Sequence, residues 1–179
     1  DIDSSCQCID LAEKYDILYA GIGIHPHEVS KVEDNYLDVL GSMAQHKKVV
    51  AIGEIGLDYY YDFSPREAQK KCFVEQIELG AQLKLPIIIH NRDSHEDMLN
   101  ILRAHKSLIN GGVMHCFSGS WEMAKIVLDL GLYISLGGPV TFKNAKKPVE
   151  IAENIPMDRL LLETDSPYLT PVPYRGKRN

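Results

Sequence analysis

The chain has 179 residues, with 19 Lys and Arg against 25 Asp and Glu, so its formal net charge is −6 with histidine counted neutral. Apolar residues make up 45% and charged residues 25%, which excludes a disordered, collagen-like or coiled-coil chain. Four cysteines without a CxxC pair argue against a disulfide scaffold, a zinc ribbon and a thioredoxin-like motif. The length favours one domain over residues 1–179, and because no apolar stretch approaches the ~18 residues of a membrane span we expect it to be soluble. The cysteine usage fits a reducing compartment, so we expect a cytoplasmic protein.

Short apolar runs alternate with longer amphipathic segments along the whole chain, which predicts a βαβα order. The runs are rich in β-branched residues, as in parallel strands buried on both faces. They cover residues 17–24, 49–52, 87–89, 112–114, 132–136 and 159–162. The predicted helices cover residues 5–15, 36–46, 65–83, 94–102, 121–130 and 144–154, with Ser64 and Ser120 as expected N-caps.

Five of the six runs are followed by a residue that can bind metal or transfer a proton: His25, Glu54, His90, His115 and Asp165. From His25 to Asp165 there are about 28 residues per interval, the length of one βα unit. In an open sheet the outer strand ends would lie roughly 24 Å apart, whereas a TIM-type (β/α)₈ barrel gathers them around one axis. The pattern therefore favours an α/β barrel of which about six units are present, with an open doubly wound sheet as the alternative. The absence of an initiator Met favours a fragment.

Glu54, His90, His115 and Asp165 carry the ligand types that Zn²⁺, Mn²⁺ and, less well, Mg²⁺ accept, and a carboxylate can bridge two such cations. Any one of these histidines by itself is more often structural than a ligand. His25 suits a supporting or phosphate-binding role, unless its loop is merely structural. Arg92 has the geometry to bind an anion at the metals, or it forms a surface ion pair with a neighbouring acid.

Three consecutive tyrosines, Tyr59, Tyr60 and Tyr61, follow Asp58 after the second predicted strand. Exposed tyrosines beside a cation site suit stacking of unpaired bases. The alternative is that they pack a loop. Since the chain is acidic, a nucleic-acid partner must be attracted by local cations or bound metal.

At these residues the sequence resembles the TatD family of metal-dependent deoxyribonucleases, which are amidohydrolase-like barrels. The matching motifs are Gly23-Ile-His-Pro-His27, Ala51-Ile-Gly-Glu-Ile-Gly-Leu-Asp-Tyr-Tyr60, Ile88-Ile-His-Asn-Arg92, Met114-His-Cys-Phe-Ser-Gly119, Leu162-Glu-Thr-Asp-Ser-Pro167 and Arg175-Gly-Lys-Arg-Asn179. The resemblance implies a two-metal barrel in which Glu54 bridges both cations and His90 and His115 complete one site. Asp165 would bind the other cation and orient or deprotonate the attacking water.

The family's first strand carries a His-x-His pair, and the family continues beyond the last motif, so the resemblance implies a chain shortened at both ends. We accordingly expect this chain to bind one divalent cation much better than two and to be weakly active or inactive. Two tight sites of equal affinity in a titration would contradict this.

The leading functional hypothesis is a metal-dependent deoxyribonuclease, with His25 and Arg92 binding the phosphate of single-stranded DNA or chain ends. No obligate protein partner is inferred. The same site suits an ester or amide hydrolase, including a D-aminoacyl-tRNA deacylase. A hypothesis from another class is a non-catalytic metal-binding domain.

Overall fold

The computed structural model describes residues 1–179, and their contacts divide the chain into two compact units, unit 1 (Asp1–Gly112) and unit 2 (Val113–Asn179). The elements of unit 1 are α1 (Ile2–Lys14), β1 (Ala20–Ile22), α2 (Tyr36–Met43), β2 (Val49–Asp58), α3 (Arg66–Leu83), β3 (Ile87–Arg92) and α4 (His95–Ala104). Those of unit 2 are β4 (Gly112–Met114), which begins at the boundary, α5 (Trp121–Asp129), β5 (Tyr133–Leu136), α6 (Lys146–Asn154) and β6 (Leu160–Leu162).

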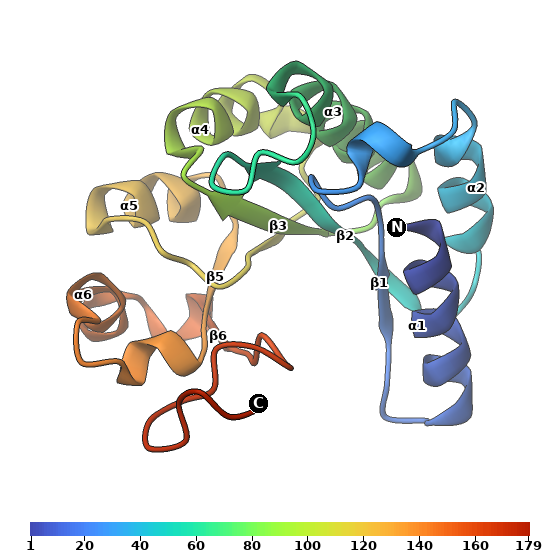
Figure 1. The fold of residues 1–179 in the computed structure, drawn as a ribbon. Coiled ribbons are helices and arrows are strands. Elements are labelled where there is room, and N and C mark those ends of the chain that lie inside the picture. The colour runs from blue at the N-terminus through green and yellow to red at the C-terminus, as the bar shows by residue number, and fades with distance from the viewer. The chain divides into compact units, whose positions relative to one another are not determined.

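The three strands of unit 1 form a parallel sheet in the order β1-β2-β3, with helices on one side (Figure 1). Ile22 lies opposite Ile52 in the β1/β2 register, and Gly56 lies opposite His90 in the β2/β3 register. Apolar strand residues and Phe73 of α3 are fully buried and form the core of this unit. Parallel strands need such continuous apolar runs because helices cover them.

Unit 2 has its own parallel ladder in the order β4-β5-β6. Ile134 of β5 lies opposite Met114 on one side and Leu160 on the other. Val127 of α5 and Ile151 of α6 are fully buried and supply helix residues to the core of this unit. None of the helices in the chain combines the length and the apolar character needed to span a bilayer.

Every predicted strand and helix is present, but the strand lengths change where the metal-competent residues lie. β2 continues to Asp58 and β3 to Arg92, so Glu54 and His90 lie within strands and not after them. The reason is that Ile55 and Leu57 beyond Glu54 are fully buried and continue the pairing with β3. β1 is shorter than predicted, because Ile17 and Tyr19 are exposed before it.

One predicted helix cap is wrong and the other is confirmed. Helix α3 begins after Pro65 without a side-chain cap, since the Ser64 hydroxyl instead accepts the Ser30 N–H and donates to the His27 carbonyl. The Ser120 hydroxyl accepts the Met123 N–H at the start of α5, as predicted. Ser64 thus connects the segment after β1 to the segment before α3.

Gly56 of β2 is expected to tolerate no side chain. A Cβ there would lie 2.0 Å from the His90 carbonyl oxygen, and φ is +143°. Gly56→Ala should lower the free energy of unfolding by at least about 3 kcal/mol, measured by urea denaturation. Gly111→Ala is the matched control, since its φ of +96° is also positive but its Cβ would meet nothing within 4 Å. A cost of only about 1–2 kcal/mol is expected there, and equal losses in both variants would contradict the close approach at Gly56.

Tyr36 makes the stability of unit 1 sensitive to alkali. Burial, and then the hydrogen bond that its hydroxyl donates to Glu75, raise the pKa of Tyr36 well above its usual value. The folded chain therefore keeps this proton when the unfolded chain begins to lose it near pH 10, so stability is complete below that pH and falls above it. Tyr36→Phe should reduce this alkaline slope in denaturation curves at pH 8 to 11. An unchanged slope would show that other groups cause it.

Candidate metal centre

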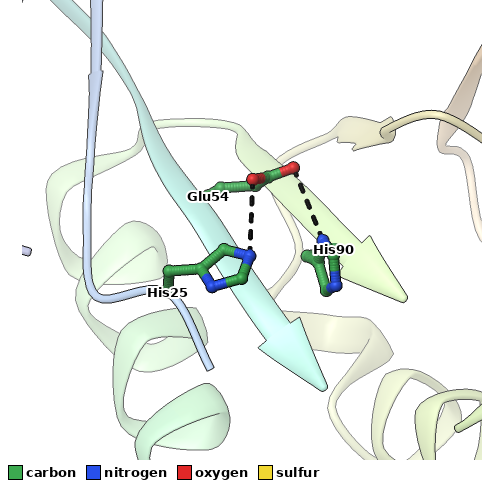
Figure 2. A group of neighbouring side chains, drawn as sticks. All are labelled: His25, Glu54 and His90. Atoms are coloured by element: carbon green, nitrogen blue, oxygen red, sulfur yellow. Dashed lines mark ion pairs between the residues drawn. The ribbon is translucent and has the colours of Figure 1, made fainter. Parts of the chain in front are cut away.

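Three side chains of unit 1 converge where the segment after β1 passes β2 and β3. His25 follows β1, Glu54 lies in β2 and His90 in β3, and their ligand atoms all lie within 4.8 Å of one another. His25 Nε2 is 3.6 Å from Glu54 Oε2, and His90 Nδ1 is 3.8 Å from Glu54 Oε1 (Figure 2). The two rings thus face the two oxygens of one carboxylate.

Asp58, the last residue of β2, holds the surrounding side chains in place. It is fully buried, and its Oδ2 accepts a hydrogen bond from Nε2 of His90 and another from Nε2 of His27, each at 2.9 Å. Burial alone would raise the pKa of this carboxyl, but the hydrogen bonds from His90, the Tyr61 N–H and His27 outweigh it and hold the pKa well below its usual range. Asp58 is therefore ionised at neutral pH and can only accept hydrogen bonds.

The hydrogen bond to Asp58 decides which nitrogen of His90 is available to a metal. Burial by itself would lower the pKa of His90, but the hydrogen bonds to Asp58 and Glu54 outweigh it and raise this pKa. Since Asp58 accepts from Nε2, the proton that remains on the neutral ring is the one on Nε2, and loss of the other proton frees the Nδ1 lone pair on the side of Glu54. A histidine whose second ring nitrogen donates to a carboxylate is the usual arrangement of a metal ligand. Glu54 and His90 therefore fit a divalent cation that accepts oxygen and nitrogen ligands.

His25 has the opposite orientation. Its Nδ1 accepts the backbone N–H of His27 at 3.2 Å, so the proton of the neutral ring lies on Nε2, the nitrogen that faces Glu54. Burial, and then the neighbouring His90, lower the pKa of His25 to about 4, which keeps the ring neutral at pH 7. His25 thus offers an N–H donor where His90 offers a lone pair.

Unit 2 contains a second pair of this kind. His115 follows β4, and its Nδ1 contacts Oε2 of Glu163. The same oxygen accepts the hydroxyl of Ser135 at 2.9 Å and the N–H of Cys116 at 3.2 Å. Nε2 of His115 lies 3.5 Å from Oδ1 of Asp165. His90 and His115 therefore each direct one ring nitrogen to a supporting carboxylate, Asp58 or Glu163. The other ring nitrogen of each histidine faces a predicted metal ligand.

The four predicted ligands are found as two pairs, Glu54 with His90 in unit 1 and His115 with Asp165 in unit 2. That all four hold metal together stays a prediction. The supporting carboxylates Asp58 and Glu163 were missed as parts of the site. A signal was available in each case, because Asp58 directly follows the buried Leu57 and Glu163 directly follows the last strand.

Two further residues near these pairs take defined positions. The Arg92 guanidinium lies 3.9 Å from the centre of the Tyr60 ring, so it makes an aromatic contact and not the alternative surface ion pair with a neighbouring acid. Burial, and then the charge of Glu163, raise the pKa of the Cys116 thiol to about 12. The thiol is therefore protonated at neutral pH.

A family model described as TatD related DNase matches residues 1–179. The chain belongs to this TatD-related family of metal-dependent hydrolases. It is 51% identical over 173 residues to a Bacillus subtilis protein named uncharacterized metal-dependent hydrolase YabD, covering 97% of this chain and 68% of that protein. It is also 37% identical over 173 residues to the Salmonella typhimurium 3'-5' ssDNA/RNA exonuclease TatD, covering 95% of this chain and 66% of that protein.

Among solved structures, the TatD homologue YJJV of Escherichia coli superposes with a TM-score of 0.92 at 36% identity. The match covers 99% of this TatD-family chain and 69% of that structure. The predicted fold class is thereby confirmed as α/β, with about six βα units of a TIM-type (β/α)₈ barrel. The chain spans about two thirds of the length of these three relatives.

Proposed function

We propose that this TatD-family chain is the part of a divalent-metal-dependent hydrolase that carries Glu54, His90, His115 and Asp165 as metal ligands, and that the bond cleaved is a DNA phosphodiester. The observation that carries the proposal is the arrangement Asp58–His90–Glu54, in which a buried carboxylate holds an imidazole with its free nitrogen toward a second carboxylate. The pair His115 and Asp165, supported by Glu163, repeats this arrangement.

The cations would act as Lewis acids and lower the pKa of bound water. Zn²⁺, Mn²⁺ and Mg²⁺ are the candidates, and the donor set does not select one of them. The chain's own groups would do the rest. Asp165 would orient the attacking water and accept its proton. His25 Nε2–H and the Arg92 guanidinium would donate hydrogen bonds to the phosphate oxygens, a role for which a neutral, donor-oriented imidazole is suited.

The choice of DNA over another ester rests on the family description and on the printed activity of the Salmonella relative, a single-stranded DNA and RNA exonuclease. The test is to incubate the chain with each cation in turn, using single-stranded DNA and an aminoacyl ester as parallel substrates and EDTA as the control. Metal-dependent DNA cleavage is expected, at the low rate that follows from binding one cation much better than two. Cleavage of the ester alone would instead support a deacylase, and metal binding without hydrolysis of either would support a non-catalytic domain.

If His25 donates a hydrogen bond to the phosphate and does not bind metal, its removal should affect cation affinity much less than removal of a metal ligand. His25→Ala should change the affinity for Mn²⁺ or Zn²⁺, measured by calorimetry, by less than about threefold, while weakening oligonucleotide binding. His90→Ala should lower the cation affinity by more than about 100-fold, since it removes a ligand and not a supporting group. Equal losses of cation affinity in the two variants would make His25 a third ligand of the site.

A further inference from the structure

Three aromatic side chains after β2 form an exposed cluster in unit 1, which we call the aromatic platform (Tyr60, Tyr61 and Phe63). Their exposed fractions are 57%, 47% and 65%. The Tyr61 and Phe63 rings stack with centroids 5.2 Å apart and an interplanar angle of 23°, and Tyr60 meets Tyr61 edge-on at 4.9 Å. Packing of the loop alone does not account for rings that keep about half of their surface in solvent.

The platform is fixed to the same carboxylate that orients His90. Oδ1 of Asp58 accepts the backbone N–H groups of Tyr60 and Tyr61, at 3.1 and 2.9 Å. The His27 ring, which donates to the other oxygen of Asp58, lies edge-on to Tyr61 at 5.3 Å and to Phe63 at 5.0 Å. His25 in turn lies 4.3 Å from His27. A continuous set of ring contacts therefore connects the platform to the candidate metal site within unit 1.

Arg92 adds a cation to the platform. Its guanidinium lies 3.9 Å from the Tyr60 ring centroid and 4.8 Å from that of Tyr61. Its backbone is held against the same loop, because Arg92 lies opposite Asp58 in the β2/β3 register and its carbonyl accepts the Tyr59 N–H at 2.9 Å. In a chain of net charge −6, Arg92 thus supplies a local positive charge beside the platform.

We propose that the aromatic platform stacks an unpaired nucleobase next to the bond to be cleaved, while Arg92 binds the adjacent phosphate. This inference rests on the proposed function. It adds a preference for single strands and assigns that preference to the aromatic platform and Arg92. Aromatic faces accept any base that is not already stacked in a duplex, and a neighbouring cation follows the phosphate backbone. A paired base has no free face to offer, so the platform would favour single strands or frayed ends.

The test is a binding measurement that needs no turnover. A fluorescein-labelled oligothymidine and an abasic oligonucleotide of the same length are titrated with the chain in EDTA, and binding is followed by anisotropy. Tyr61→Ala and Phe63→Ala should each raise the Kd for oligothymidine at least about fivefold, the lower end of measured base-stacking effects. For the abasic strand, both variants should match the natural chain.

Control variants separate stacking from general aromatic or folding effects. Tyr19→Ala removes a tyrosine that is 62% exposed and lies under Lys48 at 4.7 Å, but directly before β1 and not in the loop after β2, so it should leave both affinities unchanged. Tyr61→Leu and Phe63→Leu keep apolar volume without an aromatic face and should show the same loss as the alanine variants. Arg92→Gln should weaken both oligonucleotides and reduce the salt dependence of binding by about 0.7 in the log–log slope.

Different experimental results would overturn the platform and the proposed function. Unchanged oligothymidine affinity in the Tyr61 and Phe63 variants, or an equal loss on the abasic strand, would overturn the platform even if the chain cleaves DNA. Base-dependent binding that the two variants weaken, with metal-dependent cleavage of the aminoacyl ester and not of DNA by the natural chain, would support the platform and overturn the phosphodiesterase.

Discussion

Glu54→Ala is expected to abolish metal-dependent hydrolysis and to weaken cation binding more than about 100-fold. Glu54 is the residue toward which both His25 and His90 turn a ring nitrogen, and it is the only carboxylate in that group of three. Without it, His90 is the one remaining residue of unit 1 that we propose as a ligand, and a bound cation would also lack the negative charge that offsets its own. Calorimetric titration with Mn²⁺ and Zn²⁺ measures the affinity independently of turnover.

The matched control is Glu67→Ala, which removes a glutamate whose side chain is 88% exposed in the first turn of α3. It should keep the cation affinity and activity of the natural chain. Hydrolysis that persists in Glu54→Ala at saturating metal would overturn the bridging role implied by the family resemblance. Loss of cation binding in both variants would indicate damage to the fold and not to the site.

Asp58→Asn should have the second largest effect, because this side chain supports both the fold and the site. An asparagine has only one acceptor oxygen, whereas Asp58 uses both oxygens to accept from His27, His90 and two backbone N–H groups. Breaking such a buried ionic network costs about 3–5 kcal/mol of unfolding free energy. Since His90 also loses its fixed orientation, cation affinity should fall about 10- to 100-fold.

Urea denaturation and calorimetry on the same variant measure the two effects separately. Asp62→Asn is the control, as Asp62 lies in the same loop but pairs with Arg66 at the surface, where such a pair contributes no more than about 1 kcal/mol. A folded Asp58→Asn variant with unchanged cation affinity would show that His90 is held in place by packing alone.

The order and type of the elements, and the identity of the main candidate residues, could be predicted from the sequence. The alternation of short β-branched runs with amphipathic segments shows which side chains can be buried in strands and helices. This pattern is visible along the chain before the tertiary arrangement is known. For the same reason, polar residues that interrupt such runs, such as Glu54 and His90, are recognisable as candidates without any structure. Their motifs were sufficient to indicate the TatD family, which the comparison confirms.

Strand ends could not be read in this way. A polar residue within an apolar run was interpreted as the end of the strand, yet β2 passes through Glu54 and continues to Asp58. Whether a polar residue ends a strand depends on its partner strand, and the pairing of Leu57 with Asn91 is a tertiary contact.

The role of each imidazole depends on contacts that form only when the chain folds. His25 and His90 are the same side chain in similar apolar contexts, but one accepts a backbone N–H at Nδ1 and the other donates to Asp58 at Nε2. The hydrogen-bond partner of each ring nitrogen decides which nitrogen carries the proton, and these partners are brought to the rings by folding. The roles of Asp58 and Glu163 followed from the same cause, because a carboxylate becomes a supporting group only when folding buries it against a histidine.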